Sequence, residues 1–366
     1  MAILLVLTGI FWLGGFWFLF RLPLCKAGVL KMKYPGVTLI IPARNEEQNI
    51  GRLLDSVNSQ RIKPDEIIVV NDNSTDRTKE ISLKKKARVL DSSELPPGWL
   101  GKPWACLQGA RHASEETLLF LDADTEFTAN GYENLLDTFQ QLSCRDRTAM
   151  SLSPYHAVKR FHEELSLMFN IIMTGSMNAF TPLKDAIPAG LFGPCLMVRK
   201  EDYFSVKGHE PVKDKILENV FIGDEFKKKG IRLKCFGGRH SLACRMYPES
   251  LNSLIRGWTK AFASGAGKTP HLLLLNIIAW ISAGFIISIQ LAFALFSQGS
   301  FLLWLVFYFL FAFQLSWMGA RVGSFRILSF IFFPVHLLFF CMVFFLSLYF
   351  KLSGRAVDWK SRNITQ

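Results

Sequence analysis

Residues 117–124 read TLLFLDAD, an uninterrupted apolar run that ends on two carboxylates. A short apolar run bounded by polar residues is typical of a buried strand. Asp122 and Asp124 are separated by one residue, and in extended chain such residues point to the same side. Both carboxylates are therefore predicted to face one ligand, and hard oxygen donors suit Mg²⁺ or Mn²⁺. Aspartates are also common in solvated turns, so this pair alone leaves both interpretations open.

Two further strand-like runs precede this one, and each also ends in a polar cluster. Residues 37–41 (VTLII) lead into PARNEE, and residues 66–70 (EIIVV) lead into NDNSTD. Between them, apolar residues recur at the spacing of one helix face, at Ile50, Leu53, Leu54 and Val57. Strands that alternate with helices predict βαβ units, and hence an α/β domain built on a mostly parallel sheet.

The three polar clusters are predicted to lie at one edge of that sheet. In open parallel sheets, ligands bind beyond the carboxyl ends of the strands. Asp72, in the second cluster, is a candidate ligand-binding residue, although an Asx-turn is an equally ordinary role for it. Ser74 or Thr75 is predicted to cap the helix that follows.

The composition indicates a membrane protein. The chain has 366 residues, a formal charge of +12, 50% hydrophobic residues, 33 Phe and 9 Trp, which excludes a disordered or fibrous chain and disfavours a purely soluble one. Apolar stretches at 1–20, 272–296, 301–318 and 327–350 approach the ~20 residues that cross a bilayer. The seven cysteines show no CxxC spacing, which favours reduced thiols over disulfides or a zinc site.

These stretches divide the chain into an anchor at 1–20, a water-soluble domain at 34–268, membrane helices at 271–350 and a basic tail at 351–366. Basic residues follow the first stretch, which fits an uncleaved anchor and places the domain in the cytoplasm of a multi-pass cell-membrane protein. The basic tail also indicates the cytoplasm, which four full spans do not allow. Residues 327–350 contain Pro334 and His336 and are the candidate for a re-entrant segment.

The ordered motifs resemble those of inverting family-two glycosyltransferases with the GT-A fold, and more closely the diaponeurosporenoate glycosyltransferases of carotenoid pathways. The resemblance rests on PARNEE, NDNSTD and DAD, and on later stretches that run in order to the end of the chain. These are WLGKPWAC (99–106), PYH (154–156), KRF (159–161), FGP (192–194), EDY (201–203), GH (208–209), RMY (245–247), GWTK (257–260), SGAG (264–267) and WK (359–360).

The resemblance implies roles for individual residues. Asp72 is expected to contact uracil, Asp122 the ribose, and Asp124 the diphosphate-bound Mg²⁺ or Mn²⁺. A divalent ion at this place would neutralise charge that develops on the departing UDP. The remaining residues expected to bind the nucleotide sugar are Pro42, Ala43, Glu46 and Lys102.

The chain departs from the family pattern at the catalytic base. The family usually carries a Glu-Asp pair below the acceptor, whereas this chain has Glu218 followed by Asn219. An amide cannot accept the proton as a carboxylate would, so Glu218 is the candidate base, with Asp224 and Asp214 in reserve. A carboxylic-acid acceptor is already ionised and needs almost no base. The alternative is that Glu218 is an acidic residue favoured by a helix N-terminus.

His209 and Trp258 are the candidate acceptor residues. Trp258 lies near the position of the QxxRW motif of polymerising relatives, but Ser253 replaces the Gln and Gly257 separates Arg256 from Trp258, which disfavours a processive synthase. An interfacial anchor is the other interpretation of Trp258. The lysine runs at 84–86 and 227–229 are interpreted as solvated or lipid-facing surface, and no nucleic-acid partner is expected.

The resemblance therefore implies an inverting transferase that moves a sugar, glucose from UDP-glucose, to a lipophilic acceptor at the bilayer. The favoured acceptor is the carboxylate of a C30 carotenoid acid, which would give a glycosyl ester. Polyprenyl phosphate or a glycerolipid is the alternative acceptor class. A catalytically silent membrane scaffold is the alternative from another class of protein, suggested by Asn219 alone.

Overall fold

The structure, a computed structural model, describes residues 2–28, 34–184, 190–266, 269–296, 300–353, 357–359 and 362–364. The chain forms two compact units, a sheet unit of residues 23–155 and 189–245 and a helical unit of residues 1–22, 156–188 and 246–366. The units are interleaved along the sequence, because residues 156–188 and those beyond 246 belong with the apolar helices. Each unit is described by itself.

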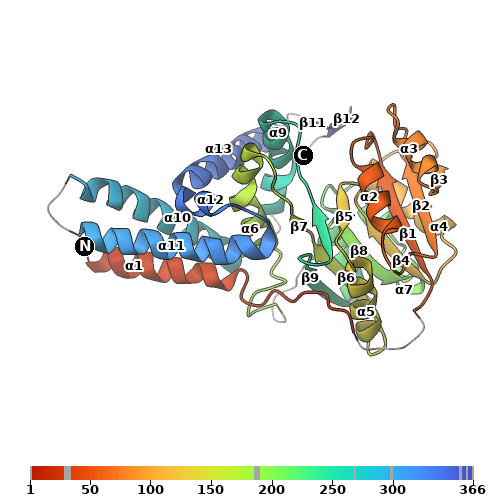
Figure 1. Cartoon of the computed structure of the whole chain (residues 1–366), viewed down its shortest axis with the longest axis horizontal. Coiled ribbons are helices and arrows are strands. Elements are labelled where there is room, and N and C mark those ends of the chain that lie inside the picture. The colour runs from red at the N-terminus through yellow and green to blue at the C-terminus, as the bar shows by residue number, and fades with distance from the viewer. Residues whose placement is uncertain are drawn as a thin grey trace. The chain divides into compact units, whose positions relative to one another are not determined.

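The sheet unit alternates strands and helices along most of its length (Figure 1). Its elements are β1 (Val37–Ala43), α2 (Ile50–Asn58), β2 (Glu66–Asn71), α3 (Thr78–Lys84), β3 (Arg88–Asp91), α4 (Gly101–His112), β4 (Thr117–Leu121), β5 (Thr125–Phe127), α5 (Gly131–Ser143), β6 (Thr148–Ser153), β8 (Cys195–Arg199), α7 (Lys200–Ser205), η3 (Glu210–Val212), α8 (Glu218–Lys228), β9 (Arg232–Gly237) and β10 (Leu242–Cys244), with β7 (Tyr155–His156) at the unit boundary.

The main sheet has the strand order β3-β2-β1-β4-β8-β6-β9. The strands expected at 37–41, 66–70 and 117–121 are confirmed as β1, β2 and β4, which pair in parallel with β1 at the centre. Only β8, among the strands of this sheet, runs against its neighbours β4 and β6. The α/β class with a mostly parallel sheet is therefore confirmed.

Alternate residues of β1 enter hydrophobic clusters on opposite faces of the sheet. Leu39 and Ile41 pack with the buried face of α2, whose four expected positions are all buried. Ile40 instead packs with α4 and α8. Burial on both faces explains why the strand reads as a continuous apolar run.

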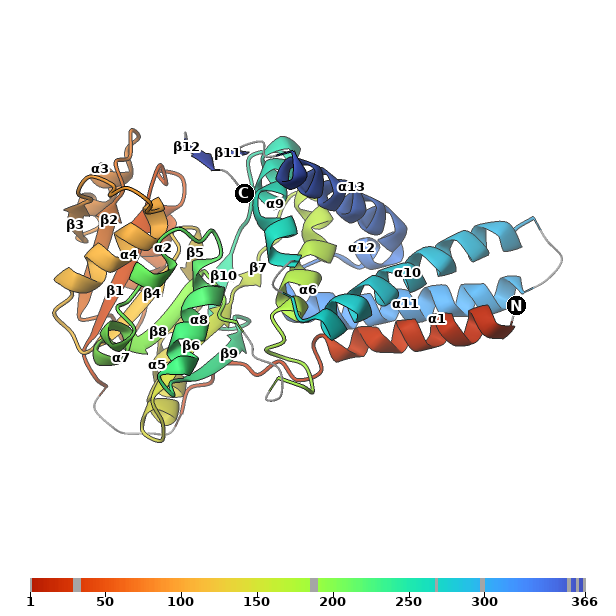
Figure 2. The same ribbon diagram turned by 180° about the vertical axis from the view of Figure 1, so that it is seen from behind.

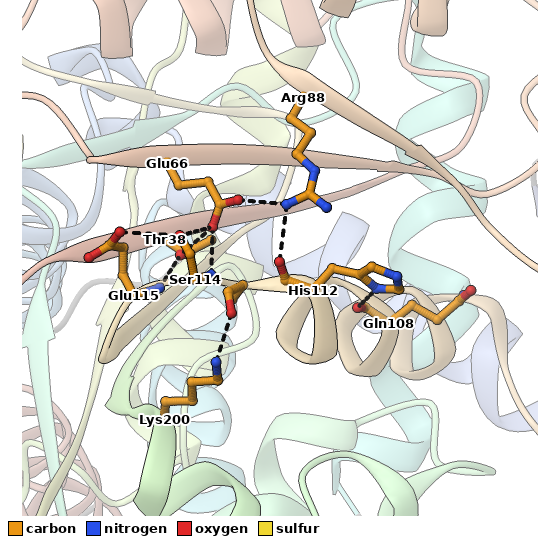
Figure 3. A network of polar contacts seen from close by, with 9 residues as sticks. Thr38, Glu66, Arg88, Gln108, His112, Ser114, Glu115 and Lys200 are labelled. Atoms are coloured by element: carbon orange, nitrogen blue, oxygen red, sulfur yellow. Dashed lines mark hydrogen bonds and ion pairs between the residues drawn. The ribbon is translucent and has the colours of Figure 1, made fainter.

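A polar network fixes the amino edge of the parallel strands (Figure 3). The Glu66 carboxylate accepts hydrogen bonds from the Thr38 hydroxyl at 2.8 Å and from Ser114 N–H at 2.8 Å, and it pairs with Arg88 at 2.7 Å. Burial works to raise the pKa of Glu66, but these donors outweigh it and hold the pKa below its usual value. The network ties β1, β2, β3 and the start of β4 together at the edge opposite the three polar clusters.

The helical unit is dominated by long apolar helices (Figure 2). Helix α10 lies beside both α1 and α11, and the short helix α6 contacts α10, α11 and α13. The elements are α1 (Ala2–Gly14), η1 (Gly15–Trp17), η2 (Phe161–Ser166), α6 (Leu167–Ser176), α9 (Leu251–Ala266), α10 (His271–Ala294), α11 (Phe301–Val322), α12 (Ile327–Ile331), α13 (Phe333–Leu352), β11 (Val357–Trp359) and β12 (Arg362–Ile364).

Among the described residues, three helices are long and apolar enough to cross a membrane, namely α10, α11 and α13. The N-terminal apolar helix, Ala2–Trp17, is shorter than this. Residues 327–350 are the candidate for a re-entrant segment in the sequence. The structure divides this stretch at Phe332 into α12 and α13. Pro334 lies in the first turn of α13, where its missing N–H costs no hydrogen bond, so α13 has 20 continuous residues.

The close packing of α4 on the sheet gives a stability prediction. A Cβ at Gly109 would lie 2.5 Å from Ile40 Cγ2 and 3.1 Å from Val70 Cγ2. Gly109→Ala is expected to lower the free energy of unfolding by ~1–3 kcal/mol, since overpacking forces these side chains to move. Gly51→Ala is the control, because its Cβ would meet Ile81 at an ordinary 3.4 Å. Thermal unfolding of both variants in detergent would show the difference, and equal stability would contradict the packing argument.

Candidate active site at the carboxyl edge of the sheet

The ends of β1 and β2 form the first part of the site. Pro42 and Ala43 pair in register with Val70 and Asn71. Just beyond, Asp72 N–H donates to the Ala43 carbonyl at 2.8 Å. This hydrogen bond holds the Asp72 backbone beside the strand ends. Asp72 is 5% exposed, so its side chain is largely enclosed.

The turn after β1 and the turn after β2 are locked together by side chains. Glu46 N–H donates to Thr78 Oγ1 at 2.7 Å, and Asn45 N–H donates to Ser74 Oγ at 3.1 Å. The Glu46 carboxylate accepts a hydrogen bond from Asn49 at 2.8 Å. The two turns expected to bind the nucleotide therefore form one interlocked edge.

The expectation that Ser74 or Thr75 caps the next helix is wrong. Helix α3 begins at Thr78, and the Asp76 carboxylate accepts from both Thr78 N–H and the Thr78 hydroxyl. Ser74 is instead used to hold Asn45. Several side chains of NDNSTD can accept a hydrogen bond from the start of a helix. In the structure, Asp76 is the one that contacts the first turn of α3.

Asp122 and Asp124 occupy the turn between β4 and β5. Asp122 N–H donates to the Pro194 carbonyl at 3.0 Å, and the Thr125 hydroxyl donates to the Asp122 carbonyl at 2.8 Å. Both aspartates are half-buried. Cys244, on β10, lies close enough that Asp124 and Asp122 add to the burial that keeps the pKa of its thiol well above the usual value.

Lys102 joins Asp122 to Glu218. The ammonium lies 2.7 Å from Asp122 Oδ1 and 3.0 Å from Glu218 Oε1, and it donates to the Gly193 carbonyl at 3.4 Å. Its side chain is 35% exposed, so solvent still reaches it. Burial works to lower the pKa of Lys102, but the two carboxylates outweigh it and the pKa lies well above its usual value.

Asn219, where the resemblance leads one to expect the family's base, acts as a hydrogen-bond donor. Its side-chain N–H groups donate to Glu218 Oε1 at 2.9 Å and to the Gly193 carbonyl at 3.2 Å. Glu218 is the first residue of α8 and its side chain is 7% exposed. Sequence reasoning missed the part played by the Gly193 carbonyl, although Gly193 lies within the FGP stretch that carries the family resemblance.

The two reserve candidates for the catalytic base, Asp214 and Asp224, pair with nearby lysines other than Lys102. Asp214 pairs with Lys215 at 2.9 Å and Asp224 pairs with Lys227 at 2.7 Å, and both side chains are more than half exposed. The carboxylate of Glu218, the first candidate for the base, contacts Lys102 and Asn219 instead.

The two expected acceptor residues are buried in different units. His209 is 1% exposed, its Nδ1 is hydrogen-bonded to the Tyr203 hydroxyl at 2.7 Å, and burial together with Lys102 lowers the pKa of His209 to about 3. Trp258, in the helical unit, is 5% exposed; its Nε1–H donates to Ser166 Oγ at 3.1 Å and its ring stacks on Phe169. Their contact with an acceptor stays a prediction.

The donor set fits a divalent ion that arrives with its substrate. Among the described residues, no group of three or more His, Cys, Asp and Glu side chains is placed to hold a metal ion. Asp122 gives one oxygen to Lys102, and Asp124 follows two residues later. Mg²⁺ is commonly held by one or two carboxylates and completed by phosphate oxygens and water, which is what this edge can supply.

Comparison with known proteins agrees with this geometry. The family described as "Glycosyl transferase family 2" matches residues 38–188. The 4,4'-diaponeurosporenoate glycosyltransferase of Staphylococcus aureus (strain USA300) is 34% identical over 343 residues, covering 92% of this chain and 90% of the relative, and that of strain N315 has the same identity and coverage. Among solved structures, the mannosyltransferase PcManGT from Pyrobaculum calidifontis, in complex with GDP-Man and Mn²⁺, has a TM-score of 0.54 at 17% identity and covers 92% of this chain and 98% of that one.

The fold and the polar edge thus define a glycosyltransferase with the GT-A fold, and the chain belongs to glycosyl transferase family 2. Within that family it is similar over nearly its whole length to 4,4'-diaponeurosporenoate glycosyltransferase. The expected enzyme class is confirmed, and the carotenoid-related resemblance is confirmed at the level of a homologue.

Asp124 supplies a test of the metal site. Asp124→Asn is expected to keep the fold, since the residue lies in a turn outside the strands, but to lose most transfer activity and the metal-dependent part of nucleotide binding. EDTA should abolish wild-type activity and Mn²⁺ or Mg²⁺ should restore it. Asp55→Asn, which removes a surface partner of Lys85, is the control. Full wild-type activity in EDTA would exclude the metal role.

Proposed function

We propose that the enzyme transfers glucose from UDP-glucose, with inversion, to the carboxylate of a C30 carotenoid acid and forms a glycosyl ester. The observation that carries this proposal is the pair Glu218–Asn219. An amide stands where the family has its basic carboxylate, and it donates hydrogen bonds rather than accepting a proton. The name of the homologous relative supports the same acceptor class.

The chemistry balances without a catalytic base. An oxygen of the ionised acceptor attacks C1 of glucose as the bond from C1 to the diphosphate oxygen breaks, and UDP leaves with the electron pair. A carboxylic acid is ionised near neutral pH, so no proton has to be removed. Glu218 serves as base only when the acceptor is a hydroxyl; with an ionised acceptor it holds the donors Lys102 and Asn219 in place.

The nucleotide half of the site is assigned to the interlocked turns. Asp72 receives the uracil N–H, while Pro42, Ala43 and Glu46 form the wall beside the base and ribose. Asp122 contacts the ribose and Asp124 is the protein ligand of Mg²⁺ or Mn²⁺. The ion, when bound, supplies Lewis-acid stabilisation of charge on the leaving diphosphate.

The acceptor reaches this enzyme from the bilayer. A long polyene partitions into lipid, and α10, α11 and α13 have the length and composition to hold the enzyme there. Nucleotide sugars are made in the cytoplasm, so the sheet unit is placed on the cytoplasmic face of the cell membrane, in accord with the basic residues after the first apolar stretch.

Orientation is tested by thiol labelling of intact cells. A variant whose one cysteine is the exposed Cys144 should resist a membrane-impermeant reagent until the cells are permeabilised. A variant whose one cysteine is introduced by Ser300→Cys, between α10 and α11, should be labelled from outside. Labelling of Cys144 in intact cells would overturn the cytoplasmic placement.

The acceptor class is tested with Glu218→Gln. Purified full-length enzyme is given UDP-glucose and a polyene acid, the corresponding polyene alcohol, or polyprenyl phosphate, and products are identified by mass spectrometry. Wild type should form the ester from the acid. Loss of a general base costs ~10²–10⁴-fold, so Glu218→Gln should lower any transfer to the alcohol by that order and transfer to the acid much less.

Glu225→Gln, on the exposed face of the same helix and paired with Lys228, is the matched control. An equally large loss with the acid would contradict transfer without a base. If product forms from polyprenyl phosphate alone, the acceptor belongs to the alternative class and is not a carotenoid acid. If no UDP is released with any acceptor, the protein is the catalytically silent membrane scaffold.

A further inference from the structure

Lys102 has three acceptors for its three N–H donors. They are Asp122 Oδ1, Glu218 Oε1 and the Gly193 carbonyl, at 2.7, 3.0 and 3.4 Å. A lysine ammonium offers three donors and no more. A phosphate oxygen could therefore bind this ammonium only by displacing one of the three partners.

The position of Lys102 in its helix is unfavourable without those partners. Lys102 is the second residue of α4, a helix of 12 residues. A cation near a helix N-terminus is disfavoured by the helix dipole. Two carboxylates offset that cost. The neighbouring His209 cannot replace the cation, since burial and Lys102 lower the pKa of His209 to about 3 and keep its ring neutral.

The two carboxylates that Lys102 holds come from different parts of the sheet unit. Asp122 follows β4 beside the nucleotide-binding turns, whereas Glu218 begins α8. Because both contact one nitrogen atom, the separation of the two carboxylate oxygens cannot exceed the sum of the two contact distances. At such a separation two anions repel each other when no cation lies between them.

We propose that Lys102 is a positioning residue that fixes the nucleotide-side carboxylate Asp122 and the acceptor-side carboxylate Glu218 at one separation, rather than a ligand of the nucleotide. This inference rests on the proposed function, which assigns Asp122 to the nucleotide side and Glu218 to the acceptor side. It replaces the nucleotide-binding role that the family resemblance implies for Lys102. The acceptor side of the site is then fixed relative to the nucleotide side through Glu218, whose carboxylate also accepts a hydrogen bond from Asn219.

The test is a double-mutant cycle in the full-length enzyme with Lys102→Met, Glu218→Gln and both together. Misplacement of a reacting group by about 1 Å can cost ~100-fold in rate. Because Lys102 acts through Glu218, Lys102→Met should lower kcat for the acid acceptor by about the same factor as Glu218→Gln, on the order of tenfold and well below the loss of a general base. UDP affinity in the presence of Mn²⁺, measured by calorimetry, should fall by a clearly smaller factor than kcat, since the Asp122 backbone stays held by Pro194 and Thr125 when Lys102 is removed. Lys102→Arg should recover part of kcat, since a guanidinium can also pair with both carboxylates.

In the Glu218→Gln background, Lys102→Met should cost much less than in wild type, because the residue acts through the carboxylate that is already absent. Lys228→Met and Glu225→Gln form the matched cycle on the same helix, and their effects on kcat should be small. A loss of UDP affinity that equals the loss of kcat would show that Lys102 is a nucleotide ligand. Additive effects of Lys102→Met and Glu218→Gln on kcat would also overturn the proposal.

The cycle has a second readout that does not require a correct acceptor. Removing Lys102 is destabilising because it leaves the charge of the largely buried Glu218 carboxylate uncompensated. The fall in Tm of the double variant should therefore be smaller than the sum of the two single falls. If wild type transfers sugar to none of the acceptors, the proposed function fails, yet this cycle still decides whether Lys102 holds Glu218; additive Tm changes would refute it.

Discussion

Parallel pairing of β1 with β2 on one side and β4 on the other is the constraint on which the site depends. Strands that run the same way end at the same edge, so PARNEE, NDNSTD and DAD are brought together although about 80 residues separate the first from the last. The amino edge is fixed by Glu66 and its donors, which keeps β1, β2 and β3 in register. Pro42 and Ala43 then end β1, and Glu46, Asp72, Asp122 and Asp124 lie just beyond the parallel strands.

Much of this arrangement could be predicted from local patterns. Short apolar runs gave β1, β2 and β4, and the spacing of Ile50, Leu53, Leu54 and Val57 gave the buried face of α2. These predictions hold because strand and helix periodicities act over a few residues. The reversed direction of β8 depends on strands distant in sequence, and the hydrogen bond from Thr78 N–H to Asp76 at the start of α3 depends on a choice among several polar residues. No short pattern specifies either.

The site follows the same division. The position of Asp122 and Asp124 could be predicted, because it follows from the end of one strand. The contacts of Lys102 could not, since its partners Asp122, Gly193 and Glu218 are 20, 91 and 116 residues further along the chain. The apolar helix α6 was also hidden in the sequence, because 10 residues are too few to read as a membrane segment, yet it packs among α10, α11 and α13.

The pair Glu218–Asn219 links the departure in sequence to the charge of the acceptor. A hydroxyl acceptor enters neutral and must lose a proton, so its site needs a carboxylate that can receive one. Here the second residue of the pair is a donor, and Glu218 already accepts from Asn219 and from the Lys102 ammonium. Such donors tolerate an acceptor that brings its own negative charge better than a second carboxylate would, because like charges at close range repel. On the proposed function, Asn in place of Asp at 219 therefore suits an acceptor whose nucleophilic oxygen is already charged. The enzyme does not have to create that charge by removing a proton.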